Sequence, residues 1–337
     1  MPPSIPFGLA AGLATALLFA SAGAGGMTGR VILFFLAPLP SYLAGLGWGW
    51  VSAAIAAATS AVVTSMILGA RTGFVFMLSQ GLPLVTLCYL VMLSRPAALT
   101  APLPPGSPPP LQWYPIGRIV AVATVIAGAL SLVSILLLGA DLEALRTMMR
   151  ELVDRMLEKQ LPGLGGDGLG DAERTALAGM LLHALPAGTA TLWLGGFLLN
   201  LWLGGKIMRI SGHLTRPWPD VRLMRFPRGF GLGLALAIAA ASLLPDVPSL
   251  LATGFVGAFL LAYLLMGLAI IHYATQGMAA RAFVLWGVYL GLILFNSWAA
   301  LVIALLAILE PLMWYRRPDL PEDGGPAPPV PPTPPAT

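Results

Sequence analysis

The run Leu250–Tyr273, LLATGFVGAFLLAYLLMGLAIIHY, decides the class of fold. It contains no Asp, Glu, Lys or Arg. At about 1.5 Å per helical residue it is long enough to cross the roughly 30 Å hydrocarbon core of a bilayer. A single helix of this kind predicts a membrane-embedded chain, and the rest of the sequence repeats the pattern.

The overall composition points the same way. Of the 337 residues, 58% are apolar and only 9% are charged, against roughly 25% charged residues in ordinary soluble domains. So few charges cannot cover the surface of a soluble protein, which excludes a soluble enzyme, a nucleic-acid-binding domain and a secreted disulfide scaffold. The net charge of +4 is interpreted as basic cytoplasmic loops. The lone Cys88 cannot form an internal disulfide.

Further apolar runs in the chain are predicted to span the bilayer as well. They are Phe7–Ala24, Val31–Trp48, Val51–Leu68, Phe74–Leu93, Ile116–Leu138, Thr175–Leu203, Gly229–Leu244 and Phe283–Leu309. Pro38 and Pro40 interrupt the second span, and Gly81-Leu82-Pro83 predicts a kink in the fourth. Phe283–Leu309 is interpreted either as one tilted helix or as a hairpin of two short helices, and the charge pattern favours the hairpin.

Four segments do not read as spans. Residues 94–115 are rich in proline and predict an extended spacer. Residues 141–160 form an amphipathic helix that lies on the membrane surface or caps the bundle, with Leu142, Leu145, Met149, Leu152 and Met156 as its apolar face. The loop of residues 205–228 is basic, and residues 316–337 form a proline-rich tail expected to be disordered.

The basic loop sets the predicted orientation. It holds Lys206, Arg209, Arg216, Arg222, Arg225 and Arg228 against Asp220 alone, so we expect it in the cytoplasm. Counting spans in both directions then places the N-terminus and the C-terminus in the cytoplasm and the amphipathic helix outside. The localisation predicted from these features is a bacterial inner membrane.

Motifs for catalysis are not evident. Gly163-x-Gly165-x-x-Gly168 matches a dinucleotide fingerprint in spelling, but it follows a surface helix rather than a strand, which argues against nucleotide binding. His183, His213 and His272 are far apart in sequence and do not form a metal-binding motif. We therefore expect no enzyme activity, no cofactor and no metal.

A few polar residues in or beside apolar runs are candidates for function. His272 ends the eighth span beside Tyr273, and it is either an interfacial anchor or a ligand-binding or proton-handling residue. Glu310 either pairs at the interface or needs a buried partner, for which Arg281 and His272 are candidates. Gln80 and Asn200 are interpreted first as hydrogen-bonding residues between helices and second as substrate ligands.

Two stretches resemble a known family. Phe35–Pro40 with the following glycine-aromatic run to Gly49 is one, and Gly267-Leu268-Ala269 with His272, Arg281 and Glu310 is the other. Together they resemble the YybS-like family of predicted bacterial multi-pass membrane proteins, a domain of unknown function. The N-terminal part is also similar in pattern to the substrate-binding subunits of energy-coupling-factor vitamin transporters, which implies a pocket among small-residue helices.

The sequence therefore predicts an all-α, polytopic integral membrane bundle of nine or ten hydrophobic segments over residues 1–315, with one extra-membrane amphipathic helix. The first functional hypothesis is a transport-related protein whose broken helices line a cavity for a small solute or whose surface binds an accessory partner. The alternative is a non-catalytic scaffold or assembly factor. The expected partners are the lipid bilayer and an unidentified protein or small solute, with no nucleic acid.

Overall fold

The computed structural model describes residues 4–22, 27–97, 109–138, 141–160 and 170–310, and almost all of these residues are helical. Eight helical segments are long and apolar enough to cross a membrane, and the shorter apolar helix Phe230–Leu243 is a ninth hydrophobic segment of the described residues. Every backbone N–H and C=O within such a helix is satisfied locally, which is what a hydrocarbon environment demands. The predicted all-α polytopic membrane fold is confirmed.

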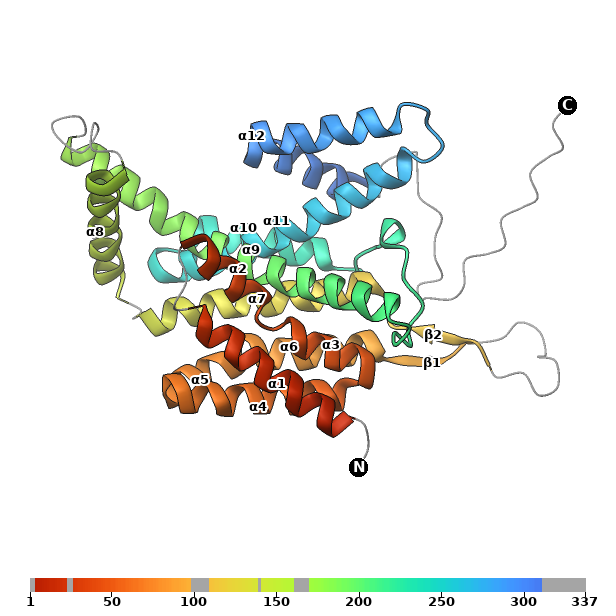
Figure 1. The fold of residues 1–337 in the computed structure, drawn as a ribbon. Coiled ribbons are helices and arrows are strands. Elements are labelled where there is room, and N and C mark those ends of the chain that lie inside the picture. The colour runs from red at the N-terminus through yellow and green to blue at the C-terminus, as the bar shows by residue number, and fades with distance from the viewer. Residues whose placement is uncertain (1–3, 23–26, 98–108, 139–140, 161–169, 311–337) are drawn as a thin grey trace, which may run out of the picture.

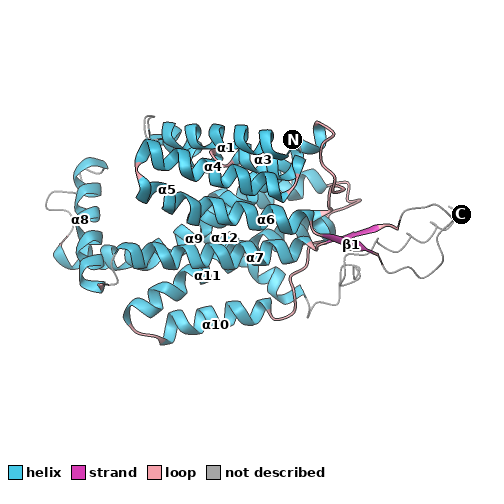
Figure 2. Cartoon of the chain, turned by 90° about the horizontal axis from the view of Figure 1, so that it is seen from below, coloured by secondary structure: helices cyan, strands magenta, loops and turns pink. Residues whose placement is uncertain are grey.

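The first half of the chain forms one layer of the bundle, and Figure 2 shows this layer stacked on the second half. Its elements are α1 (Ser4–Ser21), α2 (Met27–Leu36), α3 (Leu39–Trp48), α4 (Trp50–Leu68), α5 (Ala70–Phe76), the π-helical turn η1 (Met77–Gly81) and α6 (Leu82–Met92). The closest pairing in this layer is α1 on α4. It depends on Gly12, where a Cβ atom would lie 2.6 Å from the carbonyl oxygen of Ala56.

Two spans in this layer are broken where the sequence predicts. The second span divides into α2 and α3 around Pro38. The fourth divides into α5, η1 and α6, with the π-helical turn just before Pro83. Proline lacks the N–H that the preceding turn needs, so the carbonyls there must find another partner or a wider turn.

The second half forms the other layer around α11. Its helices are α7 (Ile116–Leu138), α9 (Asp171–Ile210), α10 (Phe230–Leu243), α11 (Asp246–Ala274) and α12 (Arg281–Leu309), with the short 3₁₀ turn η2 (Val221–Leu223) before α10. Helix α11 packs against α7, α9, α10 and α12. Contacts of α3 with α9 and of α6 with α7 join the two layers into one bundle.

Helix α9 is longer than expected. It has 40 residues, or about 60 Å at 1.5 Å per residue, whereas the sequence predicts a span of residues 175–203. The helix continues through Lys206 and Arg209, so the basic loop begins at Ser211 rather than at residue 205. Pro186 lies inside α9 without ending it.

The amphipathic helix α8 (Leu142–Gln160) lies across one end of the bundle, against the N-terminal part of α9 (Figure 1). Its buried face consists of Leu145, Met149, Val153 and Leu157. Leu152 and Met156, which the sequence places on that face, are each 42% exposed. That part of the predicted register is wrong, because the face is selected by packing on Ala178 and Leu182 of α9.

The proline-rich segment between α6 and α7 begins and ends in a short antiparallel hairpin rather than an unpaired spacer. Strand β1 (Ser94–Pro96) pairs with β2 (Leu111–Trp113), with Arg95 opposite Gln112. The predicted tail of residues 316–337 and the glycine fingerprint at Gly163–Gly168 lie outside the described residues.

Helix α12 covers the last apolar run, for which the sequence leaves open one tilted helix or a hairpin of two short helices. The chain bends at Asn296, where φ is +39° and ψ is −108°, and Figure 1 shows the two halves running back beside each other. The run is therefore a hairpin, and the first and last turns of α12 lie at the same end of it. Each half is about 20 Å long, shorter than a bilayer core.

Candidate functional site

The strongest candidate site is a small buried cavity where the two broken spans meet. Residues from both breaks line it, namely Pro38 and Ser41 from the second span and Gln80 and Gly81 from the fourth. Thr15 of α1 and Ser60 of α4 complete its polar wall. The apolar side consists of Ala57, Phe76 and Leu84.

Hydrogen bonds organise most of the polar wall. The hydroxyl oxygens of Thr15 and Ser41 lie 2.8 Å apart, which links α1 to α3. The Ser60 hydroxyl lies 2.9 Å from the carbonyl oxygen of Gly12 on α1 and 2.8 Å from that of Ala56 on its own helix. These contacts hold three helices together around the cavity.

Gln80 is the largest polar group at the cavity. It is 6% exposed and stands on the π-helical turn η1. A π-helical turn adds one residue to the helical register and often marks a functional position. No hydrogen bond to the Gln80 amide is found among the described residues, whereas buried amides are normally paired. The Gln80 side chain is therefore a polar group suited to a further partner.

The cavity has a volume of about 10 Å³. That is close to the smallest space that holds one water molecule. In this conformation the arrangement accommodates nothing larger than water, and a solute would require α3, η1 and α6 to move apart.

Asn200 does not reach this cavity. Its side-chain amide donates to the carbonyl oxygen of Phe35 at 2.7 Å and to that of Gly196 at 2.8 Å. Phe35 lies in the last turn of α2, whose carbonyls lack helical donors because the helix ends there. Asn200 thus joins α9 to the broken second span, which corresponds to the interhelical interpretation of this residue.

The candidates near the end of the chain form a separate group. His272 makes one ring contact of 2.9 Å with the carbonyl oxygen of Leu268 and another of 3.4 Å with the hydroxyl of Tyr289 on α12. Glu310 is buried. No hydrogen bond or ion pair joining Glu310 to Arg281 or His272 is found in the described part of the chain.

Polar residues that the sequence analysis did not single out are Thr15, Ser41 and Ser60. Serine and threonine in spanning helices commonly bond their own backbone, so their presence alone carries little signal. Within the described residues, no group of three or more His, Cys, Asp or Glu side chains is placed to hold a metal ion.

Spans broken by proline, a buried polar junction and a lipid-length helical bundle define a polytopic integral membrane protein. Comparison with known protein families matches residues 13–309 to the family described as "Predicted membrane protein (DUF2232)". The chain belongs to this family. No curated protein and no solved structure matches it significantly.

Proposed function

We propose that the protein is transport-related and binds a small polar solute at the cavity around Gln80. The observation that carries this proposal is the convergence of both broken spans on one small cavity that has the polar residues Thr15, Ser41, Ser60 and Gln80 in its wall. Broken helices expose backbone groups and side chains to a cavity at membrane depth, and transporters use them to bind solutes. The proposal includes the resemblance to YybS-like proteins and to vitamin-transporter subunits. It also includes the expectation that the protein is not an enzyme.

The observed conformation is the closed one under this proposal. Buried hydroxyls of Tyr42, Ser52 and Thr64 have no hydrogen-bond partner in the described part of the chain. Tyr42 belongs to α3 and the other two belong to α4, the helices that supply Ser41 and Ser60 to the cavity. Unpaired buried hydroxyls are costly, and a widened cavity with a bound solute would give such groups partners.

The orientation of the chain in the membrane is also part of the proposal. Figure 1 places the loop of residues 211–229, the β1–β2 hairpin and the start of α1 at one end of the bundle. We call this the basic end, because it carries Arg95, Arg118, Lys206, Arg209, Arg216, Arg222, Arg225 and Arg228. The positive-inside rule puts the basic end in the cytoplasm of a bacterial inner membrane.

The test is to compare solutes retained by the wild-type chain and by Gln80→Leu, using mass spectrometry of protein purified from native membranes. We expect Gln80→Leu to retain a co-purifying solute about tenfold less, since a lost hydrogen bond to a polar ligand costs roughly 1.4 kcal/mol or more. Gln276→Leu, the same change at an exposed glutamine outside the cavity, should behave like the wild type. Equal solute content in all three folded proteins would refute the proposal.

One observation favours a scaffold as the second candidate. The span Arg281–Leu309 has 17% of its most apolar window buried, the lowest share among the spans found in the described residues. Phe283, Trp286 and Trp298 project from it with more than half of their surface exposed. This exposed face is suited to binding a helix of a partner protein within the bilayer. Under the scaffold hypothesis, binding of that partner depends on these aromatic residues and not on Gln80.

A further inference from the structure

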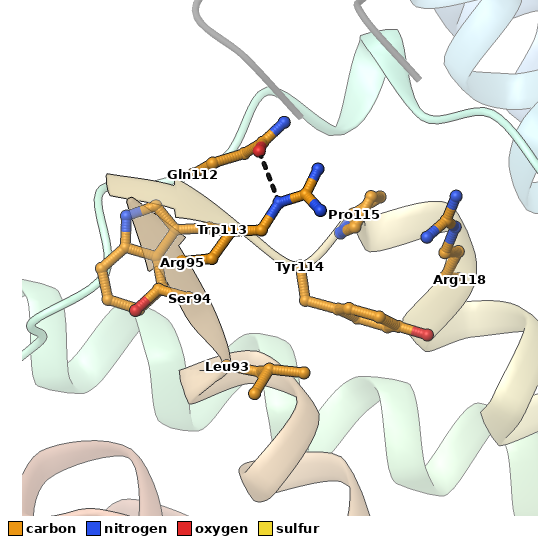
Figure 3. Close-up of a pocket in the computed structure, with 8 residues that line it drawn as sticks. All are labelled: Leu93, Ser94, Arg95, Gln112, Trp113, Tyr114, Pro115 and Arg118. Carbon is orange, nitrogen blue, oxygen red and sulfur yellow. Dashed lines mark hydrogen bonds between the residues drawn. The ribbon is translucent and has the colours of Figure 1, made fainter. Parts of the chain in front are cut away.

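A second pocket lies at the basic end, away from the Gln80 cavity. Its volume is about 340 Å³, within the usual range of ligand sites. It is formed where α6 ends, the β1–β2 hairpin begins and α7 starts (Figure 3). The residues that line it are Leu93, Ser94, Arg95, Gln112, Trp113, Tyr114, Pro115 and Arg118.

Arg216 holds the walls of this pocket in place. Its guanidinium group donates to the carbonyl oxygen of Val91 at 3.1 Å and to that of Tyr114 at 2.9 Å, so it ties the end of α6 to the strand that leads into α7. The Tyr114 amide also donates to the Leu93 carbonyl at 2.9 Å. The pocket is therefore preorganised by Arg216, which lies outside the lining, and by a hydrogen bond between two lining residues.

The lining itself is cationic. Arg95 donates from Nε to the Gln112 side-chain oxygen at 2.8 Å, which orients its guanidinium plane. In Figure 3 the guanidinium groups of Arg95 and Arg118 extend to the same side, with Pro115 between them and the Tyr114 ring below. The lining residues include two arginines and no carboxylate.

A third positive charge lies behind the aromatic wall. The Arg216 guanidinium is 5.9 Å from the centre of the Trp113 ring, and the residue is only 7% exposed. Its described partners are backbone carbonyls and this ring, with no ion pair to an acid. Burial lowers the pKa of Arg216 to about 10, because desolvation disfavours the charged form. A nearby anion would offset this uncompensated charge.

We propose that this pocket binds a phosphate group. A guanidinium group binds two phosphate oxygens at once through its planar fork of donors, and two such groups line this pocket together with Gln112 and Ser94. Trp113 and Tyr114 are residues that favour the membrane–water interface, where lipid phosphates lie. The phosphate is carried by an anionic phospholipid or is free in solution, and binding here does not depend on the Gln80 cavity.

The test measures binding to the full-length chain in neutral detergent by isothermal titration calorimetry. The probes are dioctanoyl phosphatidylglycerol, inorganic phosphate, and dioctanoyl phosphatidylcholine as a zwitterionic reference, all at matched ionic strength. We expect Arg118→Ala to weaken binding of the anionic probes about tenfold, and Arg95→Ala with Arg118→Ala to weaken it further. Binding of phosphatidylglycerol alone identifies a lipid headgroup, and binding of inorganic phosphate identifies phosphate itself.

Arg71→Ala is the matched control, since Arg71 is an exposed arginine at the start of α5, at the opposite end of the bundle. It should bind both anionic probes like the wild type. Arg118 is exposed, so its replacement leaves the hairpin intact even where the double variant does not fold. Anionic probes that bind no better than phosphatidylcholine would overturn the proposal, as would equal affinities for Arg118→Ala and Arg71→Ala.

Discussion

Gly257 shows how a single residue sets the distance between two helices. A Cβ atom on Gly257 of α11 would lie 2.6 Å from Cα of Ala187 on α9, and backbone atoms cannot move aside as a flexible side chain can. Gly188, the next residue on α9, has open space where its Cβ would be. The two glycines therefore predict opposite responses to the same substitution.

We expect Gly257→Ala to lower the free energy of unfolding by about 1–3 kcal/mol, because the added methyl group forces the two helices apart. Gly188→Ala should leave it unchanged or raise it by up to about 1 kcal/mol, since alanine favours the helix. Chemical denaturation of both variants in detergent, followed by circular dichroism, measures the difference. Two variants of equal stability would show that α9 and α11 do not pack this closely.

The candidate site was predictable only in part at this scale. Gln80 stands out in an apolar span, and the neighbouring Gly81 and Pro83 mark a break, so the residue and its setting follow from the sequence. Thr15, Ser41 and Ser60 do not stand out, because small hydroxyl side chains are ordinary in packed membrane helices. Their meeting depends on helix contacts such as that of α1 with α4.

At the scale of elements, α12 depends on one unusual backbone conformation. Asn296 has φ of +39° and ψ of −108°, a conformation that L-residues rarely adopt and that glycine adopts easily. The sharp bend that this permits turns one long apolar run into a hairpin.

Asn296→Gly should be more stable than Asn296→Ala by about 1 kcal/mol, because glycine has no Cβ to crowd the backbone at this positive φ, whereas alanine keeps the Cβ that asparagine has. Thermal unfolding in detergent measures both variants, and Ser297→Ala, at the next position along the helix, is the control. A glycine variant that is less stable than the alanine variant would be inconsistent with the hairpin.

In helix α8, the spacing of apolar residues predicts the helix but not which of its faces is buried. Its sequence carries apolar residues on two adjacent stripes, and either stripe fits a helix that covers the bundle. The stripe of Leu145, Met149 and Val153 is buried, because α9 extends far enough beyond the other spans to receive it. An ion pair of 3.3 Å between Arg174 and Asp154 adds to the same interface.

At the scale of the whole molecule, charge divides the bundle. The basic end has a large excess of arginine and lysine, whereas α8 and the start of α9 at the opposite end mix acids with bases, namely Glu143, Glu151, Asp154, Asp171 and Glu173 with Arg146, Arg150, Arg155 and Arg174. Since Cys88 is buried, the natural chain gives little background to thiol reagents. The orientation can therefore be read from single introduced cysteines.

We expect Ser211→Cys, at the basic end, to react with a membrane-impermeant maleimide only after the cells are permeabilised. Ala172→Cys, exposed at the start of α9, should react in intact cells. Labelling is measured by the mass shift of the purified chain. Labelling of Ser211→Cys in intact cells would reverse the proposed orientation.

The sequence by itself determined that this is a helical membrane protein. It also determined which apolar segments are long enough to cross the bilayer and at which positions two of them break. Those properties are local, because lipid solvation and the missing proline N–H act on each segment separately. Only the tertiary structure decided which polar side chains share a cavity, which stripe of α8 is buried and which arginines lie in and behind the pocket beside the β1–β2 hairpin. Such contacts join residues far apart in the chain, and they depend on how closely the helices pack rather than on any one segment.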